Sequence, residues 1–168
     1  MMRFTLRTAM LIATFFLVLA ASFLVDRTTK AMALSLVRLA PAASDRVPFF
    51  SFALHRNSGL AFSILADSPM AALVVSVGAV LALAVLAICL ALRAPQPLCR
   101  RGVTGLAMML GGAAGNAADR LTHGYVVDWF YLGVFINAAD LFLCVGCLLV
   151  GIDLCYAYFG WDWQDLNE

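Results

Sequence analysis

Residues 115–128 read GNAADRLTHGYVVD, and the shorter run NAAD follows at residues 137–140. These two stretches gather Asn, Asp and Arg side chains at the boundary between two long apolar runs. A charged group at membrane depth costs about 3 kcal/mol even on the lenient insertion scales. Because a chain rarely keeps several such groups together without using them, we take this boundary as the candidate functional site.

The composition around this boundary is that of an integral membrane protein. Of the 168 residues, 64% are hydrophobic and only 12% are charged, whereas charged residues make up about a quarter of a soluble domain. The length suits a single domain over residues 1–168. A formal net charge of +1 offers no basic surface to nucleic acid, so we expect no nucleic-acid partner.

Four apolar runs are long enough to cross a bilayer, which takes about 20 helical residues. They cover about residues 9–25, 71–92, 103–121 and 134–156. We therefore predict an all-α membrane protein built as a bundle of four transmembrane helices. The first run follows Arg3 and Arg7 and ends near the small residues LAAS at 19–22, so a secretory signal peptide remains an alternative for it. In the third run, the small residues GGAAG at 111–115 predict close packing against another helix.

The segment at about residues 41–66 differs from these runs. The stretch PAASDRVP at 41–48 is typical of a loop, and NSG at 57–59 is typical of a turn. Between them, FFSFALHR at 49–56 is short and rich in aromatic residues, as strands are. We predict a small β-like element lying on one membrane face, with an irregular surface loop as the alternative.

The distribution of arginines favours cytoplasmic amino and carboxyl termini. With that orientation a short tail and a short loop on the inside carry Arg3, Arg7, Arg93, Arg100 and Arg101. The positive-inside rule is strongest for such short segments. A similar number of basic residues lies outside, but they are spread through a longer segment. The segment 26–69 and the connector 122–133 then share the outer face.

Four antiparallel spans bring the polar residues of distant segments to one outer level. Asn116 shares a helix face with Asp119 and Arg120, and Asn137 shares one with Asp140, because residues three or four apart are neighbours on a helix. The converging residues are Asp26, Lys30, Asn57, Gly59, Asn116, Asp119, Arg120, Asp128, Asn137 and Asp140.

Two carboxylates held close together cannot both ionise, so one of them keeps a proton. The ionised group can then take a proton from water while the protonated group hydrogen-bonds a substrate carbonyl. Asp128 and Asp140 flank a short connector between adjacent helix ends, so we predict that they form this pair, and that Asp119 serves in a supporting ion pair. Neither His55 nor His123 has a partner at metal-ligand spacing, so we predict no metal site.

Four ordered blocks of the chain resemble the lipoprotein signal peptidase (signal peptidase II) family of bacterial aspartic endopeptidases. The run 115–128 matches the family pattern Gly-Asn-x-x-Asp-Arg-x-x-x-Gly-x-Val-x-Asp at every fixed position. The other blocks are DRTTK at 26–30, NSGLAF at 57–62 and NAAD at 137–140. The chain departs from the family in having Arg27 where Gln is usual, Trp129 where Phe is common, Ile136 where Phe usually precedes the Asn, and a shorter connector between Asp128 and Asp140.

The resemblance implies four transmembrane helices with a small extracytoplasmic β-cradle, in a multi-pass protein of the bacterial cytoplasmic (inner) membrane whose active site lies at the outer face. It implies that Asp128 and Asp140 are the catalytic pair. Asn57, Asn116, Arg120 and Asn137 would then line the site, and Asp26, Lys30, Gly59 and Asp119 would support it.

The substrate implied by the resemblance is a prolipoprotein whose Cys carries diacylglycerol, held in the membrane lipid and cut on the amino side of that Cys. No metal or organic cofactor is implied, and cyclic peptide antibiotics of the globomycin type would occupy the site in place of substrate. Two alternatives stay open: a catalytically silent relative that binds lipidated peptides, and a small transporter or scaffold whose buried charges serve packing or ion passage.

Overall fold

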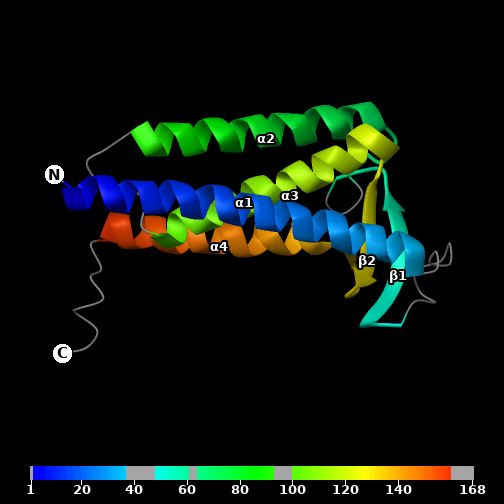
Figure 1. The fold of residues 1–168 in the computed structure, drawn as a ribbon. Coiled ribbons are helices and arrows are strands. Elements are labelled where there is room, and N and C mark those ends of the chain that lie inside the picture. Colours follow the sequence, from blue (N-terminus) through cyan, green and yellow to red (C-terminus); the bar gives the residue numbers. More distant parts are fainter. Residues whose placement is uncertain (1, 37–47, 61–63, 93–99, 160–168) are drawn as a thin grey trace.

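The computed structural model describes residues 2–36, 48–60, 64–92 and 100–159. Its elements in chain order are α1 (Met2–Leu36), β1 (Ser51–Asn57), α2 (Pro69–Leu92), α3 (Arg100–His123), β2 (Val126–Tyr131), β3 (Phe135–Ile136) and α4 (Ala138–Phe159). The four helices run alongside one another, and the strands stand together at one end of the bundle (Figure 1). That end also holds the last turns of α1 and α3 and the first turn of α4.

Three of the described helices are long and apolar enough to cross a membrane: Thr8–Leu36, Pro69–Leu90 and Ala138–Tyr156. Their large apolar side chains point away from the protein, and Leu17, for example, is 72% exposed. Apolar surface costs about 25 cal/mol per Å² in water and nothing comparable in a bilayer core. The chain is therefore a multi-pass membrane protein. The sequence analysis predicted four crossing helices, and hydropathy supports three of them.

Helix α3 differs because glycines and polar residues interrupt its apolar ones. It contacts α1, α2 and α4, so protein rather than lipid surrounds much of its surface. Its buried positions are mostly Gly and Ala, together with Asp119 and Arg120. A helix in the middle of a bundle can carry such residues because small side chains let its neighbours approach and polar ones find partners there.

The close packing predicted for residues 111–115 is confirmed. A Cβ atom on Gly111 would lie 2.6 Å from the carbonyl oxygen of Leu19 in α1, and one on Gly112 would lie 2.7 Å from that of Ala139 in α4. Further along, Gly105 of α3 and Gly146 of α4 face each other: a Cβ on either would lie within 2.6 Å of the other's carbonyl oxygen. Backbone contact at these glycines brings α1, α3 and α4 together.

The three strands form one antiparallel sheet in the order β1-β2-β3. Asn57 pairs with Val126 and Ser51 with Tyr131, with a register irregularity between Phe52 and His55. Between β2 and β3 the chain turns tightly at Gly133, whose φ of 79° suits glycine. A buried apolar cluster of Ala33, Leu54 and Val127 fixes the sheet to the last turns of α1.

Strand β1 lies in the segment 41–66 that was predicted to hold a β-like element; residues 41–47 and 61–63 of that segment lie outside the described ranges. Strands β2 and β3 were not predicted. Strand β2 occupies the connector 122–133, and β3 takes two residues from the predicted last span, 134–156. Helix α1 continues to Leu36, well past the predicted end at residue 25, because Asp119 of α3 supplies a partner for Arg27 and Lys30 there.

The facing glycines of α3 and α4 give a test of this packing. We expect Gly146→Ala to lower the free energy of unfolding by about 1–3 kcal/mol, because the added methyl group must displace the backbone of α3. Gly151→Ala, in the same helix, is the matched control, since nothing lies within 4 Å of a Cβ placed there. Denaturation of both variants in detergent measures the difference, and equal stabilities would contradict the contact.

Candidate active site

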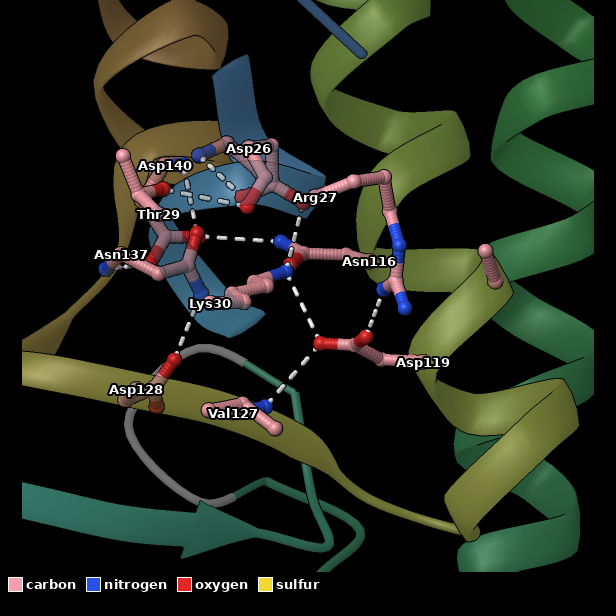
Figure 2. Close-up of polar contacts among 12 residues, drawn as sticks. Asp26, Arg27, Thr29, Lys30, Asn116, Asp119, Val127, Asp128, Asn137 and Asp140 are labelled. Carbon is pink, nitrogen blue, oxygen red and sulfur yellow. Dashed lines mark hydrogen bonds and ion pairs between the residues drawn. The ribbon is translucent and has the colours of Figure 1, made fainter. Parts of the chain in front are cut away.

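Lys30 stands at the centre of the polar cluster, with its side chain only 1% exposed. Its Nζ lies 2.8 Å from Asp26 Oδ2 and 2.9 Å from Asp119 Oδ2, and it donates a hydrogen bond of 2.7 Å to Asn116 Oδ1 (Figure 2). An ammonium group has three donors and no acceptor. Two ion pairs and one hydrogen bond therefore hold the ammonium group and join α1 to α3.

Asp26 connects the C-terminal half of α1 to the start of α4. Its Oδ1 accepts a hydrogen bond of 3.0 Å from the backbone N–H of Ala139, the residue before Asp140. The first N–H groups of a helix have no acceptor within the helix and bind carboxylates well. Gly115 of α3 lies against the carboxylate of Asp26, where any Cβ atom would collide with it.

Asp119 performs the same task for β2. Its Oδ2 accepts a hydrogen bond of 3.1 Å from the backbone N–H of Val127, the residue before Asp128. Its Oδ1 accepts a hydrogen bond from the guanidinium group of Arg27. The ion pair expected of Asp119 is present, and both of its cationic partners come from α1.

Asp140 lies in the first turn of α4 and helps to cap that helix. The N–H of Asn137 donates to Asp140 Oδ2 at 3.0 Å, and the N–H of Asp140 donates to Asn137 Oδ1 at 3.1 Å, which is the reciprocal pattern of a capping box. Asn116 Nδ2 donates to the other oxygen, Asp140 Oδ1, at 3.1 Å. Both carboxylate oxygens thus accept a hydrogen bond, which stabilises the ionised form.

Asp128 lies in β2 with 1% of its surface exposed. Its Oδ1 accepts a hydrogen bond of 2.6 Å from Asn137 Nδ2, and the side chain of Asn57 also hydrogen-bonds to it. Burial, reinforced by the charge of nearby Asp140, raises the pKa of Asp128 to about 7. Asn137 therefore connects two neighbouring acids, of which Asp128 keeps a proton up to neutral pH.

Arg120 joins this pair to the loop after β1. Asn57 Oδ1 accepts a hydrogen bond of 3.0 Å from the N–H of Gly59, which turns the chain. The carbonyl oxygen of Gly59 then accepts a hydrogen bond from Arg120 Nη2. The guanidinium group is buried, and its positive charge interacts with both Asp128 and Asp140.

The structure brings together every residue predicted for the site, from α1, the β1 loop, α3, β2 and α4. Sequence reasoning missed Arg27 and the backbone N–H groups of Val127 and Ala139. Counting the charges of this cluster could have indicated Arg27, because the single positive charge of Lys30 cannot balance both Asp26 and Asp119. Within the described ranges, no three His, Cys, Asp or Glu side chains form a group that could hold a metal ion.

Comparison with known proteins gives consistent results. The sequence model of the family described as "Signal peptidase (SPase) II" matches residues 18–156. A lipoprotein signal peptidase of Neisseria meningitidis serogroup C (strain 053442) is 36% identical over 147 residues, which cover 79% of this chain and 84% of that protein. Another, of Histophilus somni (strain 2336), is 39% identical over 142 residues, covering 80% and 84%.

The fold also has a solved counterpart. The structure of a bacterial membrane enzyme matches this one with a TM-score of 0.73, at 22% identity, over 90% of this chain and 93% of that one. At that identity the likeness speaks for the fold alone, and the sequence matches decide the family. The chain belongs to the signal peptidase II family of peptidases.

Proposed function

We propose that this chain is an aspartic endopeptidase of the membrane that removes the signal peptide from diacylglyceryl-modified prolipoproteins, cutting on the amino side of the lipidated Cys. The observation that carries the proposal is the pairing of the buried Asp128 with Asp140 through Asn137, together with the burial that raises the pKa of Asp128 to about 7. The relatives called lipoprotein signal peptidases support the substrate class.

The two acids divide the chemistry of hydrolysis between them. The ionised acid takes a proton from water, whose oxygen attacks the carbonyl carbon that precedes the Cys. The protonated acid donates to the carbonyl oxygen and stabilises the charge that develops there. When the tetrahedral intermediate collapses, the C–N bond breaks and the proton taken from water passes to the leaving amine.

We propose that α3 is a fourth crossing helix and that the sheet lies at the outer face of the bacterial inner membrane, with both termini in the cytoplasm. Arg100 and Arg101 support this orientation, because they begin α3 at the end of the bundle away from the sheet (Figure 1). Asp128 and Asp140 then lie at the outer interface, in one membrane domain.

This position suits a substrate that is itself anchored in the membrane. The lipid chains on the Cys stay in the bilayer beside the apolar outer surfaces of the helices, which sets the depth of the scissile bond. Holding that bond at the level of the two acids raises its effective concentration beside them, which speeds the reaction by proximity. Cyclic peptide antibiotics of the globomycin type would compete for the same place.

Replacement of either acid tests the proposal directly. We expect Asp128→Asn and Asp140→Asn each to lower the rate of cleavage at least about 100-fold, because each removes one half of the acid–base pair. The assay follows a lipid-modified precursor peptide on a gel, where cleavage yields two products. Asp67→Asn is the matched control, since Asp67 is an exposed residue in the turn just before α2. Full activity of either dyad variant would refute the assignment.

The pKa of Asp128 predicts the alkaline side of the pH profile. Because this pKa is raised to about 7, the carboxyl is protonated below pH 7 and ionised above it. The dyad needs one proton, so we expect kcat to fall about tenfold for each pH unit above neutrality. Single-turnover cleavage measured from pH 5 to pH 9 checks this. A rate that stays constant up to pH 9 would contradict a proton on Asp128.

A further inference from the structure

The amide group of Asn116 sits between a cation and a catalytic acid. Its Oδ1 accepts the hydrogen bond from Lys30 Nζ at 2.7 Å, and its Nδ2 donates to Asp140 Oδ1 at 3.1 Å (Figure 2). The two ends of an amide differ, because the oxygen only accepts and the nitrogen only donates. The orientation of the amide therefore decides whether Asp140 faces a donor or an acceptor.

Lys30 leaves Asn116 only one orientation. A flipped amide would point its NH₂ group at an ammonium group that cannot accept, and its oxygen at a carboxylate that cannot donate. Lys30 cannot turn away either, because its ion pairs with Asp26 and Asp119 hold the ammonium group in a site closed to solvent. The lysine thus fixes the amide with its donor facing Asp140.

The two acids each accept two hydrogen bonds and differ in how deeply they are buried. Asp140 receives one donor at each oxygen, from Asn116 and from the backbone of Asn137. Asp128 receives side-chain amides from β1 and from Asn137, but it is the more deeply enclosed of the pair. Donors aimed at both oxygens favour the charged form of a carboxyl group, and burial favours the neutral form.

We propose that Lys30 is a positioning residue: by fixing the amide of Asn116, it makes Asp140 the ionised acid that activates water and leaves the shared proton on Asp128. The inference rests on the proposed function and assigns the two halves of its chemistry. The ammonium group of Lys30 is directed at Asp26, Asp119 and Asn116, so we assign it no role at the reacting atoms.

Other charged groups face the dyad as well. Arg120 of α3 acts on both acids, and Lys30 of α1 also acts on them directly through its charge. From β1, His55 is paired across the strands with Asp128. Burial lowers the pKa of His55, so its imidazole is neutral at neutral pH. The experiment must therefore separate the action of Lys30 through Asn116 from the action of its charge through space.

The acid limb of the kcat profile reports the group that takes the proton from water. We expect Lys30→Met to move this limb to higher pH by about one unit, because Asp140 loses a donor that favours its charged form. The change in KM should stay within about twofold, because Lys30 does not meet the substrate. Asn116→Leu, which removes the donor but leaves both ion pairs of Lys30, should move the limb by a similar amount.

The double variant Lys30→Met/Asn116→Leu decides the route. If Lys30 acts through Asn116, the double variant moves the acid limb no further than Asn116→Leu alone. Additive shifts would show that the charge acts through space, and an unchanged limb in Lys30→Met would show a merely structural role. Either result overturns the proposal.

Arg101→Met is the control, because it also removes a positive charge but lies at the start of α3, over the ring of Tyr156 and away from the two acids. We expect it to leave the acid limb in place. Should Lys30→Met fail to fold, Asn116→Asp keeps an acceptor for Lys30 and replaces the donor facing Asp140 by a second acceptor. An acid limb that does not move to higher pH in Asn116→Asp overturns the proposal.

These outcomes are distinct from a failure of the proposed function. If the unaltered protein does not cleave a lipid-modified peptide, or if Asp128→Asn or Asp140→Asn remains active, then the peptidase assignment itself is wrong. If cleavage depends on both acids while the acid limb ignores Lys30 and Asn116, then only the positioning role falls.

Discussion

The ammonium group of Lys30 in the closed interior is the interaction on which the rest depends. Removing one partner from a buried ion pair costs about 3–5 kcal/mol, because the remaining charge has no solvent to stabilise it. Here Asp26 and Asp119 both pair with Lys30, and Arg27 pairs with Asp119 as well. The same two carboxylates hold the backbone just ahead of Asp128 and Asp140. The position of the pair is thus set by charges that take no part in the chemistry.

Two asparagines connect this charged framework to Asp128 and Asp140. Asn116 connects the lysine to Asp140, and Asn137 connects Asp140 to Asp128. An amide side chain carries an uncharged donor and an uncharged acceptor on separate atoms, so each asparagine can lie between charged groups without adding a charge of its own. An Asp at either place would bring a third acid next to Asp128 and Asp140.

The sequence predicted which polar residues come together better than it predicted the fold around them. Polar residues stand out against apolar runs, and fixed spacings such as that from Gly115 to Asp128 can be recognised in the sequence alone. The pairing of β1 with β2 joins segments far apart in the chain, so no local pattern announces it. The run from Tyr125 to Tyr131 lies between Gly124 and Gly133 and is rich in β-branched and aromatic residues, a pattern that could have indicated a strand but was interpreted only as a connector. The true start of α4 likewise depends on the cap formed by Asn137.

The composition of α3 has a consequence for how the protein enters the bilayer. The helices α1, α2 and α4 are each hydrophobic enough to move from water into the lipid bilayer on their own. A helix that carries Asn116, Asp119 and Arg120 near one end does not partition so readily while alone. If α3 crosses the membrane, it must do so with companions, most simply as a hairpin with the strongly apolar α2 that precedes it. The same polar residues that build the candidate site would then make biogenesis of the protein cooperative, so that assembly of the bundle and completion of this site become a single event.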